Sequence, residues 1–314
     1  MRVTNRMLTN NFLTDMTTNL NNLQKIQQQL TSGKEIRRPS DNPLKVARAM
    51  QLHSEISANK QYNENIKDTL SWLEQTDTAL GQLGDQFQRV RELLVSAGDP
   101  AYGKDERKKI NDEIKEKIGQ MSQTLNSSFD GRYIFGGTRG TSKPVNIKDG
   151  KLVYADRLGD EISSAEEIMK EKLVTEVSQG VRVEYNINAT DVIEFKDGEG
   201  NPQNLRKILE DIVDHLDSDG DIKEITTDDL ESIDLVMDNI LKLRSQVGAK
   251  GNRMESALEK NKEENFNLKE ILSKTEDVDM VEKTMEFAVA ITVYMASLQT
   301  SARVLQPTLM DYVR

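Results

Sequence analysis

The stretch from Asp277 to Arg314 constrains the fold of this chain more than any other. Its apolar residues recur at steps of three and four, which is the spacing of one helix face. From Phe287 to Ala302 there is no charged residue, although an isolated amphipathic helix usually carries a charged outer face. We therefore predict a helix that other helices enclose. Its apolar stripe consists of Val281, Met285, Ala288, Ile291, Met295, Leu298, Ala302, Leu305 and Leu309.

Two other structures could produce the same stretch. A membrane span is disfavoured, because the uncharged run is shorter than the roughly 20 residues that a bilayer requires. Polar residues such as Thr292 and Ser297 also interrupt it. The buried last helix of an ordinary globular domain is the second alternative, and the opposite end of the chain argues against it.

The N-terminal residues 1–31 carry a matching helical stripe, and Asp15 is their only acidic residue. Both ends of the chain therefore hold apolar helices with weakly solvated outer faces, which are typical of interaction surfaces. We predict that the two helices pair and then contact neighbouring copies. The predicted assembly interface consists of Met7, Leu13, Met16, Leu20, Leu23, Leu30, Val281, Met285, Ile291, Met295, Leu298, Leu305 and Leu309.

Composition narrows the class of protein. The 42 basic and 53 acidic residues give a net charge of -11, which argues against binding to a phosphate backbone. With 36% hydrophobic and 30% charged residues, slender helical packing is favoured over a large core. The chain has no cysteine, so disulfides and thiol chemistry are excluded. The first residues lack the apolar run of a signal peptide, so we expect no export by that route.

Between the two ends, the sequence predicts a helical rod with a β-rich insertion. Apolar periodicity indicates a long helix that starts at Pro43, capped by Asp41 or Asn42, and ends near Ala97. Further helices are predicted from Lys104 to Phe129, from Leu205 to Leu216 and from Leu230 to Leu272. Residues 145–154 read as a hairpin, residues 181–187 and 192–195 as strands, and residues 196–202 as a turn.

The predicted fold class is mainly α: a long helical bundle with a small β-rich inserted outer domain. Residues 1–45 and 275–314 would form an inner assembly domain of terminal helices. Residues 46–140 and 203–274 would form the helical rod, and residues 141–202 the insertion. Since an isolated helix is marginally stable in water, we expect the two terminal segments to be mobile in the free monomer and to fold on assembly.

Residues with catalytic or ligand-binding chemistry are few. His53 and His215 each lie on a predicted helix without another ligand at metal-binding spacing, so a packed or solvated role is favoured. The segment from Asp217 to Asp221 resembles the start of a calcium loop, but Ile222 stands where glycine is required. Residues 136–140 are rich in glycine, but no phosphate-loop lysine follows. We therefore expect no catalytic residue, cofactor or metal, and expect Trp72 to fill core space.

Several motifs together resemble the flagellin superfamily. Leu30-Thr31-Ser32-Gly33-Lys34 and Ile36 match its Leu-Ser/Thr-Ser/Thr-Gly-Lys-x-Ile signature. Pro39-Ser40-Asp41-Asn42-Pro43 and the run from Phe129 to Thr138 are similar to the branch of hook–filament junction proteins, the hook-associated proteins of type 3. The ending Leu309-Met310-Asp311-Tyr312-Val313 fits that branch better than filament flagellins. Residues 141–202 carry no motif of the family.

The resemblance implies a structural protein of the bacterial flagellum that acts in motility and not as an enzyme. Members of this branch are exported unfolded by the flagellar export apparatus with the help of a cytoplasmic chaperone. They self-associate in a ring between hook-associated protein type 1 and flagellin. The protein itself would thus be secreted and extracellular, at the hook–filament junction, and the same chaperone would hold the terminal helices before export. It would bind no nucleic acid and would not insert into a membrane.

Three alternatives remain. A short flagellin that forms the filament itself is the nearest one. A coiled-coil signalling or adhesion module would not need the motifs at Ser32-Gly33-Lys34 and Gly131-Arg132-Tyr133. The third alternative is an enzyme, whose active site would have to be a polar pocket in the insertion.

Overall fold

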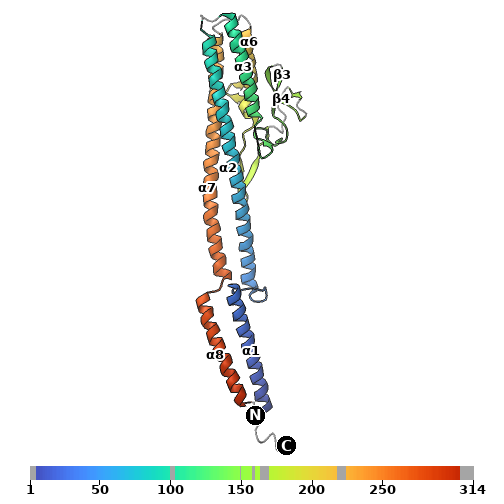
Figure 1. Cartoon of the computed structure of the whole chain (residues 1–314), viewed down its shortest axis with the longest axis vertical. Helices are drawn as coiled ribbons and strands as arrows, with labels where there is room; N and C mark the ends of the chain where they lie inside the picture. Colours follow the sequence, from blue (N-terminus) through green and yellow to red (C-terminus); the bar gives the residue numbers. More distant parts are fainter. Residues whose placement is uncertain are drawn as a thin grey trace, which may run out of the picture. The chain divides into compact units, whose positions relative to one another are not determined.

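The computed structural model describes residues 5–99, 103–148, 150–157, 160–162, 170–217 and 224–304, and Figure 1 shows them as a mainly helical protein with a few small sheets. Two of the predicted interface residues, Leu305 and Leu309, lie outside the described residues. The chain forms two compact units. Unit 1 comprises residues 1–58 and 264–314, and unit 2 comprises residues 59–263.

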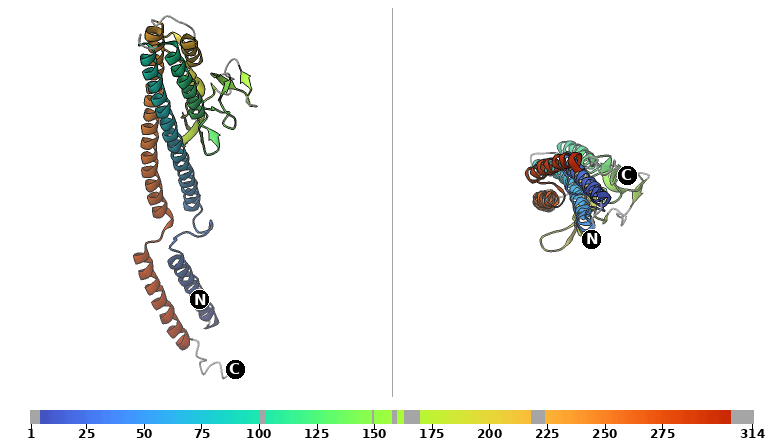
Figure 2. Two further views of the ribbon diagram at one scale, coloured as in Figure 1. Left: turned by 45° about the horizontal axis from the view of Figure 1, so that its top comes forward. Right: turned by 90° about the horizontal axis from the view of Figure 1, so that it is seen from below.

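Unit 1 is built around two terminal helices, as the apolar stripes predict. Helix α1 (Asn5–Ser32) and helix α8 (Met280–Val304) lie side by side and run antiparallel (Figures 1 and 2). Helix α1 ends at Gly33, whose φ of 69° is the left-handed conformation that glycine adopts without strain. Helix α8 begins after Asp279, whose carboxylate accepts hydrogen bonds from the backbone N–H groups of Val281 and Glu282 at 2.9 and 3.2 Å.

Unit 1 also contains the N-terminal part of one long helix and the C-terminal part of another. Helix α2 (Pro43–Ala97) begins as predicted, because the Asn42 side chain accepts a hydrogen bond from the Lys45 N–H at 3.1 Å. The Asp41 carboxylate instead accepts from the N–H groups of Arg37 and Arg38 and so fixes the preceding turn. Helix α7 (Leu230–Glu276) ends four residues before α8 begins.

Unit 2 contains a four-helix core made of α2, α3 (Lys104–Leu125), α6 (Leu205–Asp217) and α7. Helices α2 and α7 run antiparallel, since the ion pairs Arg91–Asp234 and Asp77–Arg244 join them at 2.7 and 2.9 Å. A buried amide joins the shorter helices: Asn111 donates to the Val213 carbonyl at 3.2 Å. The π-helical turn η1 (Glu224–Asp229) precedes α7.

The strands of unit 2, most of them within the insertion, form short antiparallel ladders. Strands β1 (Ser128–Phe129) and β2 (Arg132–Tyr133) form one hairpin. Strands β3 (Val145–Lys148), β4 (Lys151–Ala155) and β5 (Glu161–Ile162) form a three-stranded sheet, which confirms the predicted hairpin at 145–154. Strands β6 (Val174–Ser178) and β7 (Val181–Glu184) pair, as do β8 (Glu194–Lys196) and β9 (Pro202–Asn204).

Three details of the sequence prediction were wrong. Phe129 is in β1 and not on a helix, because α3 ends at Leu125 and a tight turn follows at Asp130 and Gly131, both with positive φ. Val192 and Ile193 belong to the short helix α5 (Ala189–Ile193) and not to a strand. Asp191 accepts the Asn188 N–H at 2.8 Å at the start of that helix, which is a local capping contact that favours the helical turn. The third error concerns the strand predicted at residues 181–187. Strand β7 ends at Glu184, and residues 185–188 form no strand.

The insertion and the helices share one hydrophobic core. Val145, Leu152 and Tyr154 are buried in the same cluster as Met121 of α3 and Leu209 of α6. The Arg206 guanidinium lies 5.2 Å from the centre of the Tyr154 ring and its Nε donates to the Leu152 carbonyl at 3.0 Å. The insertion is therefore fixed to the helices by both apolar and polar contacts.

Candidate assembly surface

The surface between α1 and α8 uses only part of each apolar stripe. Met16, Leu23 and Leu30 of the predicted interface are half-buried on α1, and Ile291 is half-buried on α8. Three aromatic residues outside the predicted interface are also half-buried: Phe12, Phe287 and Tyr294. The spacing of Phe287 and Tyr294, seven residues apart and so on one helix face, was the available signal.

The other predicted residues that the structure describes remain exposed to water in the helix pair. Met7, Leu13, Leu20, Val281, Met285, Met295 and Leu298 are exposed. Val289 and Val293, which the sequence analysis left out, are exposed as well. The exposed fraction reaches 72% at Val281 and 63% at Val289. Apolar side chains therefore lie on more than one face of α8, and its pairing with α1 leaves many of them in water.

A groove runs along one side of the helix pair. It has a volume of about 510 Å³ and is lined by Asn19, Asn22 and Ile26 of α1 and by residues of α8 that include Met285, Val289 and Val293. Glu282 and Glu286 also line it, and Glu286 pairs with Lys283. Most of the exposed wall is nevertheless apolar, so another helix with an apolar face could pack there ridge into groove. We name this surface, together with the exposed apolar residues of α1 and α8, the terminal-helix surface.

A polar clasp holds the ends of α1 and α7 together inside unit 1. The Glu35 N–H donates to the Glu276 carbonyl at 2.7 Å, and the Val278 N–H donates to the Gly33 carbonyl at 3.0 Å. The Lys34 ammonium donates to Asp277 at 2.7 Å. Together these contacts form a short antiparallel bridge between segments that are 243 residues apart.

Further side chains support the clasp. Gln29 is buried and its amide donates to the Glu35 carbonyl at 2.7 Å. His53 Nε2 lies 3.0 Å from a Glu276 carboxylate oxygen, and Lys45 pairs with Glu35 at 2.9 Å. The hydrogen bond from Lys34 lowers the pKa of Asp277 below its ordinary value of 3.8, and the Asp277 partner raises the pKa of Lys34 above 10.5.

These pKa shifts give a testable pH dependence. The pKa of Asp277 is lower in the folded protein than in the unfolded chain. Its carboxylate therefore stabilises the clasp fully above pH 3.8, and this stabilisation is lost as the pH falls through the folded pKa. The pair is exposed to water, so we expect Asp277→Asn to weaken the clasp by only roughly 0.2–1 kcal/mol. Hydrogen exchange of the peptide that contains Val278, measured by mass spectrometry on the assembled protein and corrected for intrinsic rates, should show wild-type protection unchanged from about pH 7 to about pH 5 and reduced below the folded pKa. A loss of wild-type protection already near pH 5 would contradict the assignment.

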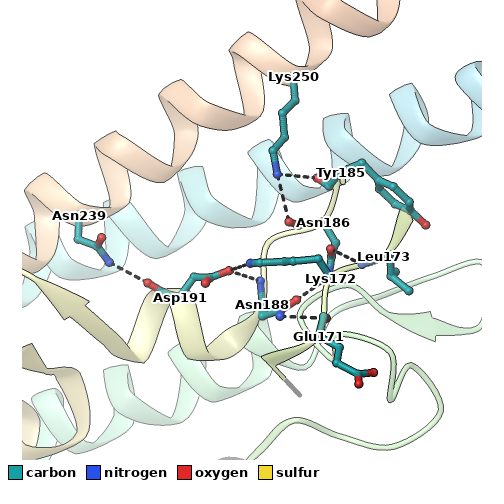
Figure 3. Close-up of polar contacts among 9 residues, drawn as sticks. All are labelled: Glu171, Lys172, Leu173, Tyr185, Asn186, Asn188, Asp191, Asn239 and Lys250. Atoms are coloured by element: carbon teal, nitrogen blue, oxygen red, sulfur yellow. Dashed lines mark hydrogen bonds and ion pairs between the residues drawn. The ribbon is translucent and has the colours of Figure 1, made fainter. Parts of the chain in front are cut away.

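A polar network in unit 2 connects the insertion to α7 (Figure 3). Asn186 and Asn188 are fully buried, and the amide of Asn186 donates to the side chain of Asn188 at 2.5 Å. From α7, Asn239 donates to the Asp191 carbonyl at 3.2 Å. Lys250, also from α7, donates long hydrogen bonds to the carbonyls of Tyr185 and Asn186 at 3.5 and 3.4 Å.

The residues that the sequence offered as possible catalytic or ligand-binding groups make contacts that support the fold. His215 contacts the buried Asp229 carboxylate at 3.0 Å, and burial raises the pKa of Asp229 although His215 opposes the shift. At Gly136 an added Cβ would meet the Arg139 carbonyl at 2.7 Å, so close backbone packing explains this glycine. Residues 218–223 of the calcium-loop-like segment lie outside the described residues. Within the part of the chain that the structure describes, no group of three His, Cys, Asp or Glu residues could hold a metal ion.

Trp72 fills core space as predicted. It is 6% exposed and meets Phe129 and Tyr185 edge to face, with ring centres 6.1 and 6.0 Å away. None of the described helices combines the length and the apolarity that crossing a bilayer requires.

Comparisons with known proteins agree on one family. The profile of the bacterial flagellin N-terminal helical region matches residues 3–139, and that of the C-terminal helical region matches residues 230–313. The flagellin of Bacillus subtilis (strain 168) is 25% identical over 294 residues, which cover 91% of this chain and 90% of the relative. The flagellar hook-associated protein 3 of Escherichia coli (strain K12) is 24% identical over 266 residues, which cover 82% of each chain.

Solved structures share the fold. Flagellar hook-associated protein 3 from Legionella pneumophila matches with a TM-score of 0.60 at 15% identity, covering 72% of this chain and 98% of that one. The FlgL protein of Xanthomonas campestris matches with a TM-score of 0.55 at 18% identity, covering 69% and 98%. The long helices with a small inserted β-rich part are therefore an arrangement that hook-associated proteins also have.

Proposed function

Because this chain belongs to the flagellin family, whose N- and C-terminal helical regions it carries, we propose that it is a structural adaptor that joins the flagellar hook to the flagellin filament. The observation that carries the proposal is the terminal-helix surface, since its exposed apolar residues need neighbouring helices to cover them. The shared fold with hook-associated proteins favours the junction over the filament.

Assembly through this surface has a simple energetic basis. Ordering the backbone costs roughly 1–2 kcal/mol per residue, and burial of a large apolar side chain returns about 1.5–3 kcal/mol. In one copy, Val281, Met285 and Val289 remain in water. Neighbouring copies in a ring would bury them and so make the helix pair stable.

The partners follow from the junction position. Hook-associated protein type 1 would contact one side of the ring, and flagellin would contact the opposite side. An export chaperone would cover the apolar face of α8 before assembly, because an amphipathic helix can be held in a groove. Secretion through the flagellar export apparatus would place the protein outside the cell. The protein would act without a cofactor and without catalysis.

The three-part division of the chain is part of this proposal. Residues 1–45 and 275–314 form the inner assembly layer, residues 46–140 and 203–274 form the rod, and residues 141–202 form the outer insertion. In this scheme the insertion faces solvent and adjusts side contacts between neighbouring copies.

Gene deletion tests the adaptor role. We expect cells without this protein to keep their hooks, to lose their filaments and to shed monomeric flagellin into the medium. Electron microscopy of the cells and immunoblotting of the medium measure these outcomes, and reintroduction of the wild-type gene is the control. Normal filaments on the deletion cells would contradict the proposal.

A short filament-forming flagellin is the second candidate, because the similarity to Bacillus subtilis flagellin extends over 91% of the chain. The purified protein distinguishes the two functions. Growth of long filaments from this protein alone would favour flagellin, whereas an adaptor is expected to form short assemblies that do not elongate.

A further inference from the structure

A groove in unit 2 has an apolar floor and a basic rim. It lies where α7 passes α5 and the β8–β9 hairpin, and its volume is about 690 Å³. Ile187, Phe195 and Leu243 are buried at its floor. Lys196 and Lys242 are exposed at its edge, and Lys250 is half-buried. We call this surface the lysine groove.

The acidic residues of the lysine groove are already engaged. Asp191 pairs with Lys172 and caps the Asn188 N–H (Figure 3). Glu194 accepts a hydrogen bond from the Tyr154 hydroxyl at 3.1 Å and pairs with Lys170 at 3.6 Å. These two carboxylates therefore have little capacity to neutralise further ammonium groups.

The ammonium groups of three lysines in the groove have no carboxylate partner in the described part of the chain. Among the described residues, no carboxylate forms an ion pair with Lys196, Lys242 or Lys250. Lys250 donates two long hydrogen bonds to carbonyl groups. Burial, together with the nearby Lys172, lowers the pKa of Lys250, although Asp191 and Glu184 oppose the shift. A positive charge in this position is costly, and an incoming carboxylate would offset the cost.

We propose that the lysine groove binds an acidic segment of a second copy of this chain. Charge complementarity favours this occupant, because acidic residues outnumber basic ones by 53 to 42 in this chain, so a neighbouring copy in an assembly supplies an excess of carboxylates. The apolar floor would accept an apolar side chain next to the acidic ones, and the lysines would fix the position of the segment. The inference rests on the proposed function, since it requires copies that lie next to one another in an assembly.

Photo-crosslinking in intact flagella tests this contact. Gln246 is exposed, uncharged and lines the groove, so p-benzoylphenylalanine at this position probes the occupant. We expect irradiation to give a dimer of this chain, with the crosslinked peptide in an acidic stretch of the partner copy. The same probe at Lys260, which is exposed on α7 outside the groove, is the control and should give far less dimer.

Charge reversal tests the role of the lysines. Lys196→Glu together with Lys242→Glu should reduce the crosslinked dimer by roughly tenfold, because attraction becomes repulsion. Lys260→Glu together with Lys262→Glu makes the same change in net charge outside the groove and should leave the dimer yield unchanged. Circular dichroism of the purified variants checks that each one folds.

Filament attachment in the same cells separates this inference from the proposed function. Attached filaments without crosslinked dimer, or with crosslinks to another protein instead, would overturn the lysine groove as a contact between copies. Crosslinked dimer along whole filaments would support the groove but contradict the adaptor role. Equal loss of dimer in both charge-reversal variants would overturn the specific role of Lys196 and Lys242.

Discussion

Replacing both Met285 and Val289 with aspartate is expected to abolish attachment of filaments to hooks. The two side chains are 61% and 63% exposed and line the groove between α1 and α8. In the monomer, aspartate at exposed positions costs little. In the assembly, two unpaired carboxylates would be buried against apolar helices. We expect the fraction of hooks that carry filaments to fall by about 100-fold, which corresponds to roughly 3 kcal/mol. Electron microscopy of the cells measures this fraction.

A matched control tests whether the loss of filament attachment is specific to the terminal-helix surface or follows from aspartate at any exposed apolar position. Val95 and Leu241 are exposed apolar residues of unit 2, at 51% and 60%. Val95→Asp together with Leu241→Asp should leave filament attachment close to wild type. If Met285→Asp with Val289→Asp also left attachment at the wild-type level, the terminal-helix surface would not be the assembly surface.

Trp72→Ala is expected to have the largest effect on the stability of unit 2. The substitution empties a buried site between Phe129 and Tyr185, and such a change typically lowers the free energy of unfolding by about 3–5 kcal/mol. Urea denaturation followed by circular dichroism measures the loss.

Trp72→Phe serves as the conservative variant. The indole Nε1 is buried and meets no hydrogen-bond acceptor among the described residues, so phenylalanine removes an unsatisfied donor while keeping an aromatic ring. We expect a loss of less than about 1.5 kcal/mol. An equally large loss for both variants would contradict the assignment of Trp72 as a residue that acts by filling volume.

The sequence was sufficient to predict the long helices, because their periodicity is a local property. The stripes at both ends led to α1 and α8, and Pro43 and Asn42 marked the start of α2. Short elements were harder to predict. Val192 and Ile193 have side chains that suit a strand, but the Asn188–Asp191 capping contact selects a helical turn.

Contacts between distant residues could not be predicted from the pattern. The clasp joins Lys34 to Asp277, and nothing in either local sequence identifies the other. The lysine groove likewise brings Lys196 next to Lys242 and Lys250 through the fold of the insertion onto α7. The stripes also did not reveal which face of α8 packs on α1, because apolar residues lie on more than one face of that helix. Exposure of Val289 and Val293 became evident only in three dimensions.

Hydrogen exchange measured by mass spectrometry on the dilute monomer and on the assembled protein tests the central claim most directly. If the terminal helices are completed by neighbouring copies, amides in α1 and α8 should exchange rapidly in the monomer and become strongly protected in the assembly. The helices of unit 2 should be protected in both states and serve as the internal reference. Strong protection of α1 and α8 in the dilute monomer, equal to that of unit 2, would contradict the account.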